Sequence, residues 1–492
     1  MKSKIKKSKI SERLKAGFVS AYALVAFAVA ITIISGLLVF VSNVMRQSSN
    51  EVSYQQALQV AESGVYFYQW YLAHNLDGKN AQQIKDFWQN GNPYGVSTPY
   101  AQDVKDFSGT PFGRYSVTVE PPDPDSTIVM VTSTGWTFKH PSIQRSVRLR
   151  LRRPSWSEYS VLANDVMRFG DGTEVYGPIH SNNGIRFDGI AHNIVTSAVT
   201  TYRDPDSGIT RPGVWTSKSN ESQVFLAGKK FPEPLVDFNS VISDFSYMRD
   251  EAQSGGLYFG GDTYEKEINC RYRWIDSRWR WRCDIAEFPV KGYHIILRTD
   301  DTIEVRKVTD YGGDIDDETE TYSITEEISM GTYPLPANGL IYVNNNAWIE
   351  GQIDTANVTI AAADLDTSED KDIYINNDIK YTNKDGRDVL GLIAENNISV
   401  GLYSEDNLEI DAALLAQKGR VGRNYYYSSS YRWRDTITVF GAIATNQRYG
   451  FAYVDGTGYD TRNLYFDNSL LYTPPPYFPT GTQYQIDLWE DL

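Results

Sequence analysis

A run of 30 residues without a charged side chain, residues 16–45, lies near the start of the chain and limits what the rest can fold into. A bilayer core of roughly 30 Å is spanned by about 20 apolar residues in a helix. The apolar part of a cleaved secretion signal is only about 7–15 residues long. The run therefore predicts a membrane-spanning helix, because the backbone must satisfy its own hydrogen bonds in lipid.

The charges on either side of this run predict its orientation. Before it stand six lysines and one arginine within residues 2–15, against the single acid Glu12, and after it stands only Arg46. The positive-inside rule places such a basic end in the cytoplasm. We therefore expect a single-pass protein with a short inner N-terminus and about nine-tenths of the chain outside.

The chain carries a net charge of −15 at pH 7, and the part beyond the basic N-terminus is more negative still. Such a domain repels nucleic acid and anionic membranes as a whole, so nucleic acid is not an expected partner.

A second helical pattern follows the uncharged run without a break. Val52, Ala57, Val60, Val65 and Leu72 recur at helical spacing, and turn residues end the pattern at 75–78. We expect one long helix over 18–78, of which the first half spans the membrane and the second half forms an amphipathic stem.

The N-terminal region resembles a known family. The basic leader, residues 1–17, ends in Gly17 and is followed by Phe18 and an uncharged helix, which is the layout of a type IV prepilin. The stem motif Ala61, Glu62, Ser63 and Gly64 resembles the AAEAG signature of PilX-type minor pilins. Residues 113–154 resemble the β-hairpins of a small pilin head, so the resemblance covers about residues 10–154.

The resemblance implies a processing step and a set of partners. A prepilin peptidase would cut between Gly17 and Phe18, and the N-terminal helix would move from the cytoplasmic membrane into contact with other pilin subunits. Shaft-forming pilins carry a glutamate five residues into the mature chain, where this sequence has Tyr22. A buried carboxylate in a membrane is costly and is kept where it has a partner. The departure argues for a minor subunit at the tip rather than a shaft subunit, and a plain signal anchor is the alternative.

The outer chain divides into segments of different composition. Residues 79–154 predict a small pilin-like head with β-hairpins, residues 155–480 a large β domain with an insertion at 200–335, and residues 481–492 a C-terminal tail. Within the large domain, four segments beginning near 179, 342, 374 and 393 repeat an apolar residue, a polar residue and an Asn-Asn or Asn-Asp pair.

Repeated short strands with polar corners favour a right-handed parallel β-helix, and a β-sandwich is the alternative. We expect the asparagines to adopt left-handed backbone angles and to stack amide on amide. Small residues such as Ala361, Ala362, Ala363, Ala412 and Ala413 suit a narrow interior. The fold class is thus mainly β with one long N-terminal α-helix.

The insertion contains a basic and aromatic stretch that is unusual in so acidic a chain. It reads as a β-hairpin in which Cys270 and Cys283 would form a disulfide, since the exterior is oxidising. Between them lie the candidate contact residues Arg271, Arg273, Trp274, Arg278, Trp279, Arg280, Trp281 and Arg282. Such a hairpin could stack on sugars or unpaired bases. The favoured interpretation is that its aromatic rings pack on the β domain and its arginines pair with the chain's own acids.

No catalytic motif can be read from the sequence. The five histidines have no metal-ligand spacing, and His180 beside an asparagine corner suits a neutral, hydrogen-bonded role. The acidic stretch Asp314, Asp316, Asp317 and Glu318 lacks the glycine and distal glutamate of an EF-hand. We expect a solvated loop there, with weak Ca²⁺ binding as the alternative, and no cofactor, no resident metal and no enzymatic activity.

The sequence as a whole predicts a bacterial minor pilin-like protein that exposes a large domain for adhesion, surface contact or assembly priming. Its ligand, the envelope type, and the choice between a pilus and a secretion pseudopilus stay open. The alternative is a signal-anchored β-helix protein that binds or cleaves polysaccharide at the cell surface.

Overall fold

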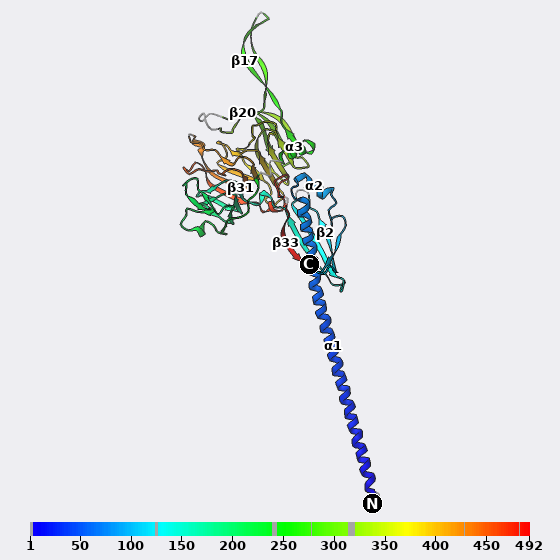
Figure 1. The fold of residues 1–492 in the computed structure, drawn as a ribbon. Coiled ribbons are helices and arrows are strands. Elements are labelled where there is room, and N and C mark those ends of the chain that lie inside the picture. Colours follow the sequence, from blue (N-terminus) through cyan, green and yellow to red (C-terminus); the bar gives the residue numbers. More distant parts are fainter. Residues whose placement is uncertain are drawn as a thin grey trace.

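The computed structural model describes residues 3–123, 126–238, 244–276, 278–312, 320–427, 429–481 and 483–492, with side chains described outside positions 3–18, 81 and 244. Figure 1 shows an elongated molecule in which a long helix leaves one end of the head and a β-hairpin projects from the opposite end of the large domain. The expected class, mainly β with one long N-terminal apolar helix, is confirmed.

Helix α1 runs without a break through the uncharged run and the stem, as Ser3–Leu76. From residue 57 onward one face of it is buried, with Val60, Val65 and Leu72 inaccessible to solvent. A short second helix, α2 (Ala81–Gln89), follows and is capped by Asn80, whose side chain accepts from the Gln83 N–H.

The stem packs on a five-stranded antiparallel sheet whose order is β1-β2-β3-β4-β33. Its strands are β1 (Tyr100–Lys105), β2 (Pro111–Glu120), β3 (Ile128–Thr137), β4 (Gln144–Arg152) and β33 (Gln485–Asp491). The last strand comes from residues expected to be a C-terminal tail, and it pairs with β4 across more than 330 positions of sequence. The large domain is therefore an insertion between the fourth and fifth strands of the head sheet.

Charge explains why the last strand adds to β4. The arginines that alternate along β4 face acids of β33: Arg150 Nε lies 2.5 Å from Asp487 Oδ2, and Arg145 pairs with Asp491. The ring of Trp489 also contacts Tyr66 of the stem, with 5.8 Å between centroids. The last strand thus closes the head at the edge of β4, with acids beside arginines on one face of the sheet and Trp489 towards the stem.

The large domain is built from short strands that pair in parallel, turn upon turn. One stack pairs successively β16 (Leu257–Phe259), β22 (Leu340–Val343), β24 (Asn357–Ala362), β27 (Val389–Ala394), β29 (Asn407–Ala416), β31 (Trp433–Thr445), β5 (Val161–Ala163), β8 (Ile179–Ser181), β11 (Val195–Ser197) and β15 (Lys229–Lys230). A second stack pairs β19 (Gly292–Leu297), β23 (Asn346–Ile353), β26 (Ile379–Tyr381), β29, β31, β32 (Gly458–Phe466), β7 (Thr173–Tyr176) and β10 (Ile190–Ala191). Parallel pairing between successive turns is the arrangement of a β-helix, whereas the sheets of an immunoglobulin-type sandwich are antiparallel.

Shorter parallel rows complete the turns. They are β25 (Ile373–Ile375), β28 (Ile398–Val400) and β30 (Val421–Arg423), and β6 (Met167–Phe169), β9 (Ile185–Phe187) and β14 (Val214–Trp215). Antiparallel additions are β12 (Thr201–Arg203) with β13 (Thr210–Pro212), β20 (Thr302–Tyr311) with β21 (Ile324–Pro334), and β17 (Thr263–Ile275) with β18 (Arg278–Pro289).

The order of turns along the large domain differs from the order of the sequence. The first turn after the head, β5, stacks on β31 near the end of the domain, through the pair Val161 and Ile443. The turns formed by residues 257–466 thus make up one half of the stack and end at the pairing of β31 with β5. The turns formed by residues 161–230 make up the other half and begin at that pairing. The chain enters and leaves the domain at adjacent points, where Ser155 and Thr480 form a β-bridge.

The first stack is buried on both faces. Ala362 and Ala412 belong to the interior core, whereas Ala361, Ala363 and Ala413 lie outside it, in a cluster with Trp156, Phe245 of α3 (Asp244–Gly255) and Phe478. The expectation that all five alanines line the interior is therefore wrong for three of them. Burial on both faces accounts for continuous apolar runs such as residues 389–394.

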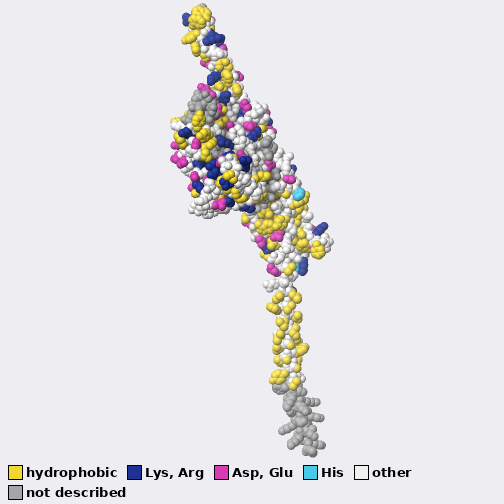
Figure 2. Space-filling view, turned by 60° about the vertical axis from the view of Figure 1, so that its left-hand side comes forward, with side chains coloured by type: hydrophobic (Ala, Val, Ile, Leu, Met, Phe, Trp, Pro, Cys, Tyr) yellow, Lys and Arg dark blue, Asp and Glu magenta, His cyan; other side chains and the backbone are white. Residues whose placement is uncertain are grey.

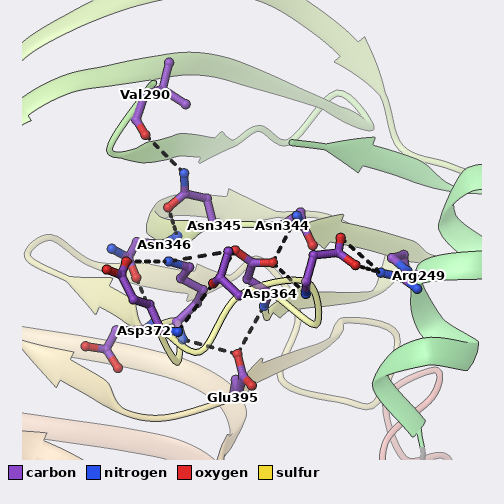
Figure 3. Close-up of polar contacts among 12 residues, drawn as sticks. Arg249, Val290, Asn344, Asn345, Asn346, Asp364, Asp372 and Glu395 are labelled. Atoms are coloured by element: carbon purple, nitrogen blue, oxygen red, sulfur yellow. Dashed lines mark hydrogen bonds and ion pairs between the residues drawn. The ribbon is translucent and has the colours of Figure 1, made fainter. Parts of the chain in front are cut away.

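Asparagine side chains link successive turns at the corners, but not with the expected backbone geometry. An amide ladder joins Asn446, Asn164 and Asn182, each step having an N–O distance of 2.8 Å. At another corner, Asn346 Oδ1 accepts from the Asp372 N–H, as Figure 3 shows. The Asp372 carboxylate accepts in turn from the Asn397 N–H. None of these asparagines has a positive φ among the described residues, so the left-handed expectation is wrong here and their role is hydrogen bonding.

Candidate contact surfaces at the two ends of the chain

The first surface is the N-terminal half of α1. All described side chains from Val19 to Met45 are exposed, and α1 is the one candidate membrane span in the described part of the chain. The Thr32 hydroxyl donates a hydrogen bond to the Ala28 carbonyl oxygen at 2.9 Å, which lowers the free-energy cost of placing this polar group in an apolar surrounding. Tyr22, at the fifth position after the expected cut, is 71 % exposed. Gly17 and Phe18 lie within the helix, and their side chains are outside the described residues.

The stem motif lies where α1 meets the head sheet. Ala61 and Gly64 face the sheet and are buried, whereas Glu62 and Ser63 are partly exposed on the flank. A Cβ atom added to Gly64 would stand 2.9 Å from a ring carbon of Tyr115, closer than side-chain carbons approach. The Ser63 hydroxyl donates a hydrogen bond to the Gln59 carbonyl oxygen at 2.8 Å. The small residues of the motif therefore allow close helix–sheet packing, whereas nothing in the structure explains why a glutamate stands at position 62.

The second surface is the hairpin β17–β18, which projects at the end opposite the N-terminal half of α1 (Figure 1). We call its outer part, the described residues 270–276 and 278–283, the tip hairpin. Cys270 and Cys283 form a disulfide across its base, with 4.0 Å between their Cα atoms. Glu267 lies near both sulfurs, but bonded sulfurs are not thiolates, so these three residues do not form a metal site.

The register of the two strands separates aromatic from basic side chains. Tyr272 pairs with Trp281 and Trp274 with Trp279, while Arg271 pairs with Arg282 and Arg273 with Arg280. Since successive side chains of a strand point to opposite faces, one face of the tip hairpin is aromatic and the other is basic. The rings meet edge to face, at 5.1 Å for Tyr272–Trp281 and 5.6 Å for Trp274–Trp279.

The favoured interpretation of this hairpin is wrong for the aromatic residues. The four rings are 58–64 % exposed, so they do not pack on the β domain. Of the five arginines, Arg273 alone has an ion-pair partner among the described residues, Asp284 at 2.7 Å. Figure 2 shows hydrophobic and basic side chains together on this projection.

A buried histidine between two carboxylates is a feature that the sequence does not reveal. His294 of β19 lies 2.9 Å from Glu327 and 3.4 Å from Glu350, and it is 9 % exposed. Burial lowers the pKa of His294, but the hydrogen bonds to Glu350 and Glu327 outweigh it and raise that pKa. The three residues come from separate strands, so no local spacing in the sequence signals them.

The sequence also singles out His180 and an acidic stretch as candidate sites. His180 is buried and bonded to the Thr196 hydroxyl at 2.9 Å, and burial lowers its pKa, so it is held neutral. The acidic stretch Asp314, Asp316, Asp317 and Glu318 lies outside the described residues.

A polar cavity of about 630 Å³ is likewise not signalled by the sequence. It is lined by Arg168, Arg186 and Arg448, whose guanidinium groups surround Asp206. Asp206 pairs with all three of these arginines, and Arg186 also pairs with Asp188, but the whole lining holds six basic side chains against four acids.

Comparisons with known proteins add little. No family model matches the chain, and no curated protein matches it. Among solved structures, the chain is similar to the competence-associated pilin ComZ from Thermus thermophilus, at 13 % identity and a TM-score of 0.28, over 89 % of this chain and 98 % of that one. A superposition of this quality carries no argument about fold or function.

Proposed function

We propose that the protein is a minor pilin-like subunit of a type IV pilus or a related filament. The observation that carries this proposal is the division of α1 into two halves. The described N-terminal half exposes apolar side chains on every side, and the C-terminal half buries one face against the head sheet. An exposed apolar surface of this extent is unfavourable in water, so the N-terminal half of α1 must lie in lipid or against other apolar helices.

The processing step follows from the leader. A peptidase that cuts between Gly17 and Phe18 removes all seven basic residues that hold the N-terminus in the cytoplasm. The remaining helix has no carboxylate near its start, since Tyr22 stands at the fifth position. Such a helix can exchange lipid contacts for contacts with neighbouring helices, but it cannot offer an acid to a neighbour's N-terminus. This favours a low-copy position at the tip.

The large domain suits surface contact rather than catalysis. It stands to one side of the head and carries its projecting hairpin away from the membrane helix (Figure 1). A body of this size beside every subunit would obstruct a closely packed shaft, whereas a tip position leaves it free. Adhesion, surface contact or assembly priming is then the role of this domain.

The test is the N-terminal sequence of the protein isolated from its native membranes. The proposal expects a chain that begins at Phe18. Gly17→Ala, and the bulkier Gly17→Leu, should leave a full-length chain that still inserts into the membrane. Gly36→Ala is the matched control, because its added Cβ meets nothing within 4 Å and it lies far from the cut. A Gly17→Leu chain that matures normally would contradict the prepilin assignment.

A polysaccharide-binding surface protein is the second candidate, and one cavity favours it. A cavity of about 380 Å³ is lined by the exposed ring of Tyr403, by the buried residues Trp348 and Tyr374, and by the carboxylates of Glu327 and Glu350. Aromatic residues with a few polar groups are typical of small-ligand sites, and Tyr403 is the ring on which a sugar could stack. This candidate expects a chain that still begins at Met1, and polysaccharide binding that Tyr403→Ala weakens.

A further inference from the structure

We propose that the tip hairpin binds a lipid surface that carries anionic headgroups. This inference rests on the proposed function in one respect, since it names what the large domain of a surface-contact protein touches. It depends on the hairpin alone and not on the assembly of a filament.

The separation of the two faces is the first step. A linear polymer that is gripped by stacking and ion pairing needs aromatic and basic side chains on the same side, so that ring and charge reach one strand together. In the tip hairpin, cross-strand pairing places the rings of Tyr272, Trp274, Trp279 and Trp281 on one face and the arginines on the other. This arrangement suits a boundary between an apolar and a polar layer. Tryptophan and tyrosine prefer the membrane–water interface, and arginine side chains extend to the phosphate level.

The charge of the tip hairpin is the second step. It contains five arginines and one acid, Asp276, in a chain whose net charge is −15. Nearer the base, Glu265, Glu267, Asp284 and Glu287 make the same hairpin acidic. The base also carries Lys266, so only the outer part has a net positive charge, and its partner must be negative.

Distance is the third step, because an acidic body would be repelled by an anionic surface. Cys270 stands seven positions after Thr263, the first residue of β17, which corresponds to roughly 24 Å of extended strand. The Debye length at physiological ionic strength is about 8 Å, so the arginines act on a surface from which the body is screened. The hairpin is therefore long enough to separate attraction at its tip from repulsion by the body of the large domain.

Rigidity is the fourth step. An isolated two-stranded hairpin is marginally stable in water. The disulfide between Cys270 and Cys283 crosses the hairpin where the aromatic and basic part begins. The cross-link holds both faces in register, so little ordering is left to be done when the hairpin meets a membrane.

The experiment uses the full chain, with α1 enclosed in a nanodisc of phosphatidylcholine so that the membrane helix cannot insert elsewhere. Binding is measured to vesicles of phosphatidylcholine alone and to vesicles in which a quarter of the lipid is phosphatidylglycerol. We expect binding only to the anionic vesicles, a shift of tryptophan emission to shorter wavelength on binding, and a loss of binding as salt rises.

Two variants test the two faces separately. Arg271→Gln with Arg280→Gln and Arg282→Gln should weaken binding about a hundred-fold, at about five-fold for each arginine near an anionic surface. Trp274→Ser with Trp279→Ser and Trp281→Ser should abolish the emission shift and weaken binding at every salt concentration. All six side chains are exposed or partly exposed, so the fold should survive. Trp433→Ser and Arg387→Gln, exposed sites outside the hairpin, are the matched controls and should bind as the parent does.

Three outcomes would overturn the proposal. One is equal binding to both kinds of vesicle, and another is unchanged binding by both hairpin variants. The third is failure to bind anionic vesicles together with retention on an acidic polysaccharide or a single-stranded oligonucleotide, which would assign the hairpin to a polymer. None of these results bears on the cut at Gly17, so the pilin proposal stands or falls on its own measurement.

Discussion

Gly135 of β3 lies directly against the backbone of the stem, and its replacement by alanine tests how the stem is held. A Cβ atom at position 135 would lie 2.5 Å from the Ala57 carbonyl oxygen and 2.8 Å from Ala61 Cα. Both neighbours belong to the helix backbone, which cannot move aside as a side chain can. Ordinary contact would be restored only if α1 lifted from the sheet by roughly 1 Å.

The cost of this change can be worked from the contacts that loosen. A gap of that size loses about a quarter to a half of the dispersion energy between the facing surfaces, and overpacking of a core costs about 1–3 kcal/mol. Replacing glycine by alanine returns about 0.4–1 kcal/mol through the unfolded chain. We therefore expect Gly135→Ala to destabilise the head by about 1–2 kcal/mol.

Hydrogen exchange read by mass spectrometry is the suitable assay, because it reports the head and the large domain separately. Peptides of β2, β3 and residues 57–76 should exchange about ten-fold faster in Gly135→Ala, since about 1.4 kcal/mol is a factor of ten. Peptides of β24 and β27 should be unchanged. Gly36→Ala, in the exposed half of the same helix, is the control and should not speed exchange anywhere. Unchanged exchange of β3 in Gly135→Ala would refute the close packing of stem and sheet at this position.

The remaining predictions concern charge and covalent structure. The pKa of His294 is raised above its ordinary value of 6.5, so protonated His294 stabilises the fold fully below pH 6.5 and loses this effect as pH rises through the raised pKa. Protection of β19 from hydrogen exchange should therefore fall in alkaline buffer in the parent protein and stay unchanged with pH in His294→Gln. Non-reducing peptide mapping should recover one linked peptide containing Cys270 and Cys283, and two free thiols would contradict the disulfide. Asp487→Asn removes a partly exposed partner of Arg150 and should weaken the pairing of β33 by about 0.5–1 kcal/mol, seen as faster proteolysis near residue 484, whereas Asp385→Asn, at an exposed site far from the head, should have no effect on this cleavage.

The sequence predicts best where a pattern is local. An uncharged run gives a helix, alternation gives strands, and two cysteines flanking a turn give a cross-link, because each depends on residues within a few turns of one another. The pattern identifies the buried face of the stem from Ala57 to Leu72, since helical spacing alone decides which residues share a face, but it is wrong for Val52, which is exposed.

Pairing across long distances cannot be read in the same way. The segment of β33 suggests only a tail, because seven residues near an end carry no signal of their partner. The one clue is complementary charge, with alternating arginines at 145–152 and acids at 487, 490 and 491. The stacking of β5 on β31 is hidden for the same reason, since any short apolar strand can pair with many others.

The tip hairpin shows that the sequence pattern does not predict which face of a strand pair is buried. Alternation correctly divides its residues between two faces, but it does not say whether a neighbouring element covers a face. Burial of the tryptophans is the natural expectation, because large rings are seldom left in water. Trp274 and Trp279 are exposed because the hairpin extends beyond the last turn of the domain, and that extension depends on where β16 and β19 end the stack.

The double connection between head and large domain explains how the two ends of the molecule keep their places. A domain attached by one flexible linker can rotate, and its outer end has no fixed direction. In this protein the segments that enter and leave the large domain pair with each other, through the Trp156 N–H to Pro479 O bond at 3.1 Å and the Gly481 N–H to Pro154 O bond at 2.7 Å. Both segments then continue into β4 and β33, which are neighbours in the head sheet. Because two paired segments resist rotation where one does not, the tip hairpin is directed away from the N-terminal half of α1 by the way the chain closes its head.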